Sequence, residues 1–432
     1  MNFSRRRFIS TAATGTMMAT LAPGVRAAFS ADSIQAGAPR DIVVAIFLRF
    51  GCDGLTMVAP AEDANYRASR PTIGVTSSGA RAGLHIGGLD GVPFFMNPSL
   101  PEMKALYDSG KLAVVHAAGL PTHTRSHFES QNMMERGVVE SDGPVLGGWL
   151  ARHLKASNLA LPDLGAVASA SVVQASLRGW PGSVAVPDVT DFNVTGGDFN
   201  LKVIEALNAG AGAPAASARA TADMIRSVKA SVAKLSSADG SVAYPLGGFS
   251  AAMRSLANVV KMKAGLEVAT VDFGGWDHHY NMNLYFPPAA GQLSQSLAAF
   301  WADLEDFQDR LTIVTMTEFG RRLEENTAGG ADHGAASVMF VLGGAVKGGR
   351  IYGQWPGLKE SQLREGDLSV TTDVRNVLQE ILVNRRGETP SAKIFPSLSY
   401  APLGIVRRPS PRGLLGRRTW PSIPIRYSVP ST

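Results

Sequence analysis

Five short stretches of the sequence combine carboxylates and imidazoles in the way that a metal-assisted hydrolase needs. They are residues 49–54, 122–129, 273–281, 317–322 and 331–334. Asp and His are suitable ligands for zinc, and a carboxylate-rich set also accepts manganese or calcium. Two divalent ions can clamp a phosphoryl or sulfuryl group while one of them lowers the pKa of an attacking hydroxyl. The composition of these stretches therefore indicates metal-assisted ester cleavage.

Alternating strands and helices must position these stretches. The apolar pattern predicts strands at 41–48, 111–117, 266–272, 311–316 and 337–342, and helices at 101–109, 215–235, 249–263 and 288–310. This alternation favours a mainly parallel sheet covered by helices on both faces, whose ligands bind beyond the carboxyl ends of the strands. Four stretches follow a strand, but 331–334 precedes one. Its loop must fold back to the same edge, or the strand at 337–342 must run antiparallel.

The first 27 residues predict an export signal. Arg5 and Arg6 begin a basic segment that precedes a moderately apolar stretch, and small residues follow at Val25 and Ala27. This pattern is typical of twin-arginine signals, so we expect export by that machinery and a periplasmic or secreted protein. No other segment approaches the ~18 continuous apolar residues of a membrane span, so no stable span is expected.

Charge and cysteine content exclude several classes of protein. Of the net charge of +5, four positive charges lie in residues 1–27 and seven in residues 389–432, which contain no acid; residues 28–388 therefore carry −6. A nucleic-acid-binding protein would need a basic face on that body. The single cysteine, Cys52, excludes an intramolecular disulfide and a zinc–thiolate cluster.

Residues 28–403 are expected to form one domain, with an irregular insertion at 182–214 that is rich in Gly, Asp and Thr. The Pro- and Arg-rich tail at 404–432 is expected to be loosely ordered. Contact of this tail with an anionic membrane surface is an alternative to a solvated tail.

Five motifs, in this order, resemble the exported family called domain of unknown function 1501. They are Asp53–Leu55, Thr124–Phe128, Gly275–His279, Thr317–Arg321 and Asp332–Gly334. That family is similar to the alkaline phosphatase/sulfatase superfamily. The resemblance implies a three-layer α/β/α fold with a mainly parallel mixed sheet, and it usually implies a two-metal site.

The resemblance also implies roles for individual residues. Metal ligands would come from Asp53, Asp277, His279, Glu318, Asp332 and His333. Ser126 would be the hydroxyl nucleophile at a helix N-terminus, where amide groups favour an anion. Arg125 would bind the phosphate or sulfate group.

Each of these roles has a structural alternative. Ser126 and Glu129 have the spacing of a helix capping box, with Thr124 as another hydroxyl, and Arg125 fits a surface salt bridge. Asp53 fits a turn after a strand. Glu318 could pair with one of the arginines that follow it, and Asp332–Gly334 could form only a cap or loop hydrogen bonds.

Two departures from the superfamily pattern leave open whether two metals bind, or one, or none. Asp277 and His279 are two positions apart rather than four, and Asn281 stands at the further position. Glu318 stands in place of the usual Asp-His pair, so one imidazole is missing unless His333 replaces it. Cys52 lacks the Cys-x-Pro-x-Arg context of a sulfatase nucleophile.

The sequence therefore predicts an exported, metal-dependent hydrolase of phosphate or sulfate esters. Zinc is the expected metal, and the expected substrate is a small-molecule or glycan ester. The alternatives are a non-catalytic exported binding or scaffold protein that keeps the fold, and a metal-dependent mutase or transferase.

Overall fold

The computed structural model describes residues 41–157, 161, 164–210, 212–236 and 242–408. The predicted export signal at 1–27 and most of the predicted tail lie outside these residues. Within the described ranges, no helix combines the length and the apolar character that a membrane crossing requires.

A nine-stranded sheet runs through the protein, and its central strand is β1 (Ile42–Leu48). β1 runs parallel to β8 (Val268–Phe273) and to β9 (Leu311–Met316). β10 (Ser337–Gly343) lies antiparallel between β9 and β5 (Leu112–Gly119). The predicted mainly parallel mixed sheet is confirmed, and the antiparallel course of β10 brings the preceding loop to the ligand-binding edge.

Shorter strands extend both sides of this sheet. The strand order is β11-β5-β10-β9-β1-β8-β6-β7, with β12 also pairing with β5. These strands are β6 (Ala166–Ala168), β7 (Ser183–Ala185), β11 (Ile351–Tyr352) and β12 (Thr372–Asp373). A separate antiparallel sheet contains β2 (Val58–Ala59), β4 (Val92–Met96) and β3 (Leu84–Leu89).

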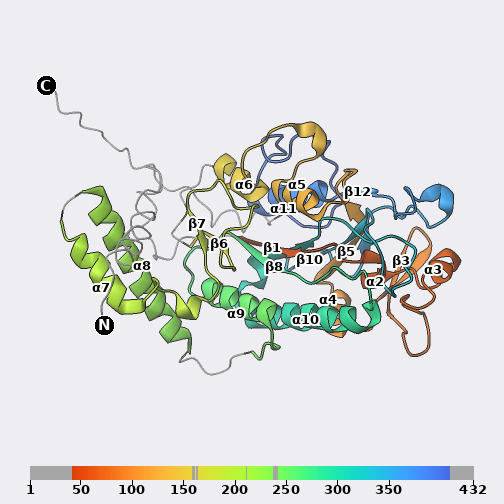
Figure 1. Ribbon diagram of the computed structural model, residues 1–432, viewed down its shortest axis with the longest axis horizontal. Helices are drawn as coiled ribbons and strands as arrows, with labels where there is room; N and C mark the ends of the chain where they lie inside the picture. Colours follow the sequence, from red (N-terminus) through yellow and green to blue (C-terminus); the bar gives the residue numbers. More distant parts are fainter. Residues whose placement is uncertain (1–40, 158–160, 162–163, 211, 237–241, 409–432) are drawn as a thin grey trace.

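Helices cover both faces of the large sheet, as Figure 1 shows. One layer contains α5 (His127–Arg136), α6 (Trp149–Ser157) and α11 (Val374–Arg386); the other contains α4 (Pro101–Asp108), α9 (Gly248–Lys261) and α10 (Met282–Asp303). Side chains of a strand alternate between faces. In β1, Val44 and Ile46 join the core under α9 and α10, whereas Val43 and Ala45 join the core under α5 and α11. The predicted three-layer α/β/α fold is confirmed.

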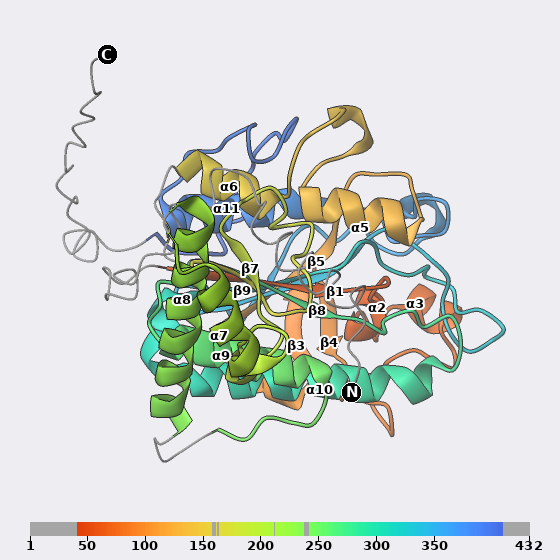
Figure 2. The ribbon, with the colours of Figure 1, turned by 60° about the vertical axis from the view of Figure 1, so that its left-hand side comes forward.

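Two segments differ from the sequence prediction. The helix predicted at 288–310 begins earlier, at Met282, because Asn281 reverses the chain at φ +47° and its carbonyl accepts from the N–H groups of Leu284 and Tyr285. The insertion at 182–214 is partly regular, since it contains β7 and α7 (Gly197–Leu207). α7 packs on α8 (Ala213–Ser236), and Figure 2 shows this pair standing at one end of the molecule.

Candidate metal centre

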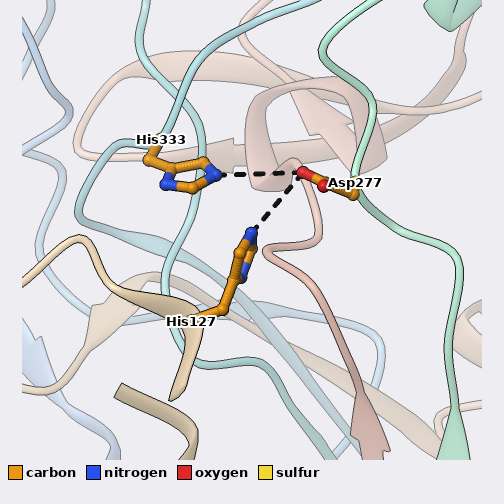
Figure 3. A group of neighbouring side chains, drawn as sticks. All are labelled: His127, Asp277 and His333. Atoms are coloured by element: carbon orange, nitrogen blue, oxygen red, sulfur yellow. Dashed lines mark ion pairs between the residues drawn. The ribbon is translucent and has the colours of Figure 1, made fainter. Parts of the chain in front are cut away.

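Three imidazoles converge on one carboxylate at the carboxyl edge of the sheet. Asp277 and His279 lie in the loop after β8, His127 begins α5, and His333 lies in the loop before β10. The distances from Asp277 Oδ1 to the imidazole Nε2 atoms are 3.5 Å for His127, 3.1 Å for His279 and 3.8 Å for His333. Figure 3 shows His127 and His333 pointing toward Asp277 from two sides. His127, Asp277 and His333 each place one ligand atom within 4.8 Å of the others.

The opposite ring nitrogen of each histidine is held by an acceptor. His127 Nδ1 lies 2.8 Å from Glu318 Oε1. His279 Nδ1 lies 2.8 Å from Asp332 Oδ1, and His333 Nδ1 lies 2.8 Å from the backbone oxygen of Arg125. Metal-binding histidines almost always donate their second N–H to such a carboxylate or carbonyl, which fixes the tautomer and the orientation of the ring.

Two of these imidazoles form a close contact that a cation would stabilise. The Nε2 atoms of His279 and His333 lie 2.9 Å apart. A backbone carbonyl can only accept, so His333 Nδ1 carries the hydrogen, and the carboxylate of Asp332 makes the same demand on His279. In the neutral rings both Nε2 atoms are therefore bare lone pairs that face each other. A shared proton or a metal ion would relieve this repulsion.

An unsatisfied nitrogen in the group points to the same conclusion. Among the described residues, His127 Nε2 is buried with no hydrogen-bond partner. A buried nitrogen without a partner costs free energy. Arg321, which is almost fully buried, donates to Asp277 Oδ1 at 2.8 Å and to the backbone oxygens of Phe50 and Gly51. Arg321 therefore holds Asp277 in place while leaving it 46% exposed at the surface.

The local charges keep the acidic groups ionised and His333 neutral. Partial burial alone raises the pKa of Asp277, but the Arg321 hydrogen bond and charge and the nearby imidazoles reverse this and lower it. Burial also opposes ionisation of Glu318, whose pKa is nevertheless lowered by hydrogen bonds from His127 and Gln131. The His279 hydrogen bond lowers the pKa of Asp332. Burial lowers the pKa of His333, so this ring favours its neutral, metal-binding form.

The predicted ligand set divides into three groups in this structure. Asp277, His279 and His333 meet at the centre. Glu318 and Asp332 contact the Nδ1 atoms of His127 and His279, whereas Asp277 lies at the Nε2 atoms of these rings. Ion pairing of Glu318 with Arg321 or Arg322, the alternative raised from the sequence, is not what its contacts show, because it accepts from His127, Gln131 and the Phe50 N–H.

Asp53 makes its described contacts with other partners. Its carboxylate caps α2 (Gly54–Met57) by accepting from the N–H groups of Leu55 and Thr56. Asp53 Oδ2 also forms an ion pair of 2.6 Å with Arg70, and both side chains are buried. These contacts satisfy the Asp53 carboxylate within the protein, and none of its described hydrogen bonds or ion pairs involves the three imidazoles.

The predicted nucleophile and anion-binding residue lie directly before His127. Ser126 occupies the N-cap of α5 but makes no side-chain cap hydrogen bond. The capping box that was the structural alternative is not formed: Thr124 Oγ1 accepts from the Ser126 N–H and donates to Glu129. Arg125 forms ion pairs with Asp367 at 2.5 Å and with Glu365 at 3.3 Å through Nη2. The Ser126 hydroxyl is therefore not used as a helix cap.

Sequence reasoning gave His127 no part in the site and considered Arg321 only as an ion-pair partner of Glu318. His127 stood in a candidate stretch, but Ser126 and the helix start drew the interpretation toward a nucleophile. One signal was available: Phe319 rather than a histidine follows Glu318, and the sequence interpretation filled the place of that imidazole with His333 alone. Arg321 gave no such signal, because its contacts with Asp277 and Gly51 depend on three distant loops meeting.

Comparisons with known proteins give weak structural matches and one family match. No curated protein sequence matches this chain. A crystal structure of Ps i-CgsB in complex with k-i-k-neocarrahexaose shares 9% identity and a TM-score of 0.37, covering 82% of this chain and 74% of the other. A crystal structure of the PsFucS1 sulfatase from Pseudoalteromonas sp. shares 13% identity and a TM-score of 0.36, with coverage of 85% and 74%.

The family comparison covers three of the five motifs. The matched segment, residues 215–389, contains Gly275–His279, Thr317–Arg321 and Asp332–Gly334. Over residues 215–389 the chain matches the family described as "Protein of unknown function (DUF1501)", and this confirms the resemblance predicted from its motifs.

Proposed function

We propose that this protein is a metal-dependent hydrolase of sulfate or phosphate esters. The observation that carries the proposal is the convergence of three imidazole Nε2 atoms on Asp277 Oδ1, with every Nδ1 anchored from behind. Four converging ligand atoms with oriented imidazoles are the usual donor set of a zinc site.

Zinc is the proposed metal, and it would be held by His127, His279, His333 and Asp277. Three imidazoles favour zinc over calcium, which prefers oxygen ligands. A bound divalent ion would supply Lewis-acid chemistry and would lower the pKa of a hydroxyl or water bound to it. Because Asp53 is already paired with Arg70, we propose about one ion per chain rather than two.

Residues next to His127 would handle the substrate. Ser126 is the proposed nucleophile, because its hydroxyl is free of the cap hydrogen bond and α5 presents its N-terminal amide groups there. Arg125 is the proposed contact for the anionic group, and its acidic partners Asp367 and Glu365 fix the side chain beside the site. The proposed substrate is a small-molecule or glycan ester outside the cytoplasm, reached by twin-arginine export.

The test is turnover by the zinc-loaded protein with 4-nitrophenyl sulfate and 4-nitrophenyl phosphate. The double variant Asp277→Ala, His279→Ala should lose both metal and turnover while keeping its circular dichroism spectrum. Ser126→Ala should lose turnover and keep the metal. Glu360→Gln, an exposed carboxylate in a 3-10 helix, is the matched control. Full turnover in the double variant would contradict the assignment.

A second candidate is a non-catalytic binding or scaffold protein. The ion pairs of Arg125 favour it, because a guanidinium already bonded to two carboxylates is less available to an anionic substrate. A protein that binds metal at these residues but hydrolyses neither ester, and that retains a glycan or protein partner, would support this candidate.

A further inference from the structure

The loop after β1 holds Phe50 in a conformation that requires explanation. Its φ is +80°, in the left-handed region that residues with side chains rarely adopt, and its side chain is 39% exposed. Strained backbone and exposed aromatic rings both cost free energy, and such strain clusters at functional sites. The position of Phe50 beside the metal centre therefore suggests a role in function.

Contacts with the metal centre fix Phe50 in this conformation. Its N–H donates to Glu318 Oε1 at 2.8 Å, and its carbonyl accepts from Arg321 Nη2 at 2.6 Å. Its ring stands edge-on to the His127 ring, with centroids 5.5 Å apart. One edge of Phe50 thus borders a proposed ligand, and the exposed remainder of the ring faces solvent.

Two glycines leave open space next to this ring. Gly274 and Gly275 are exposed and connect β8 to Asp277. A Cβ atom added to Gly274 would meet only the Phe50 ring, at 3.7 Å, and one added to Gly275 would meet nothing within 4 Å. The Trp276 N–H donates to the backbone oxygen of Arg49, which ties the two loops together. Exposed backbone without side chains, at Gly274 and Gly275, therefore lies between Phe50 and Asp277.

We propose that the Phe50 ring and the backbone of Gly274 and Gly275, here named the Phe50 shelf, bind the leaving group of the substrate. The group that fits is a six-membered ring with an apolar face, which packs on Phe50 while the ester group lies at Asp277. An aromatic ring and a sugar ring share this chemistry. This inference rests on the proposed function and adds the specificity-determining surface of the same site.

The first experiment compares esters with and without a ring. For Phe50→Ala, KM for the 4-nitrophenyl ester should rise about 3- to 10-fold with kcat nearly unchanged, since ring stacking contributes that much to binding. KM for the matching methyl ester should not change. Phe199→Ala, an exposed aromatic on α7, is the matched control. An equal effect on both esters, or loss of metal, would assign Phe50 a purely structural role and overturn the proposal.

A second experiment needs no turnover. Ligand-observed NMR with 4-nitrophenol and with methyl glucoside should show binding to the wild-type protein, and the stronger signal identifies the ring type. Gly274→Leu should abolish it by filling the shelf, because its backbone φ is not in the left-handed region. Undiminished binding in a folded Gly274→Leu protein would overturn the shelf. If Gly274→Leu loses binding but the wild-type protein hydrolyses neither ester, the Phe50 shelf is retained and the hydrolase proposal is rejected.

Discussion

The Nδ1 atom of His127 lies 2.8 Å from Oε1 of Glu318, although the two residues are 191 positions apart. Glu318 follows β9, and His127 follows β5 by a short loop. β10 lies between these strands and runs antiparallel to both, so their carboxyl ends meet at one edge. The order of the strands thus places the Glu318 carboxylate where it orients the His127 imidazole.

Glu318→Gln should weaken metal binding. The amide keeps the size of the side chain but loses the charge that holds the His127 ring, and such changes typically cost about 10- to 100-fold in metal affinity. Competition with a chromogenic chelator measures the dissociation constant. Glu360→Gln should bind zinc like the wild type, and unchanged affinity in Glu318→Gln would remove Glu318 from the site.

Asp53→Asn should destabilise the fold and leave metal content unchanged. Removing the charge of Asp53 leaves the buried Arg70 guanidinium unpaired, a loss of about 3 kcal/mol or more in the free energy of unfolding. Urea unfolding and elemental analysis measure the two quantities. The matched control is Asp63→Asn, since Asp63 caps α3 (Ala64–Ser69) in a more exposed position. Loss of metal without loss of stability would make Asp53 a ligand.

His116 should make the fold sensitive to acid. Burial lowers the pKa of His116 to about 4, from 6.5. Its Nε2 contacts the Val58 carbonyl and its Nδ1 accepts from the Ala117 N–H, so the folded protein holds the neutral ring. The unfolded chain takes up the proton first, so stability is full above pH 6.5 and falls by about 3 kcal/mol as the pH drops to 4.

His116→Gln should reduce this acid sensitivity, because glutamine can donate and accept but does not titrate in this range. Urea unfolding at pH 7 and at pH 4.5 measures the difference in free energy of unfolding between the two conditions. His85→Gln, at an exposed histidine, is the control. The same pH dependence in wild type and His116→Gln would show that other groups cause the acid sensitivity.

The sequence predicts the positions of helices and strands better than it predicts the long-range contacts between them. Continuous apolar runs such as Ile42–Leu48 are buried on both faces and were recognisable as central strands. The start of α10 was misplaced because Pro288 resembles a first-turn proline, whereas the reversal at Asn281 depends on backbone contacts with Ala328 and Gly329. Local pattern does not contain such long-range contacts.

The candidate site shows the same limit. The motifs indicated which loops carry ligand-type side chains, and Asp277, His279 and His333 do meet. Whether a carboxylate faces the common space or supports an imidazole depends on loop geometry, which separates Asp277 from Glu318. The ion pair between Asp53 and Arg70 depends on packing between two segments, and Arg70 belongs to none of the five motifs.

The measurement that tests the central claim most directly is elemental analysis of the folded protein after zinc reconstitution, for the wild type and for His127→Ala. The account predicts about one zinc ion per wild-type chain and its loss in His127→Ala, with unchanged circular dichroism in both. No stoichiometric metal in the wild type, or equal zinc in both proteins, would contradict the proposed metal centre.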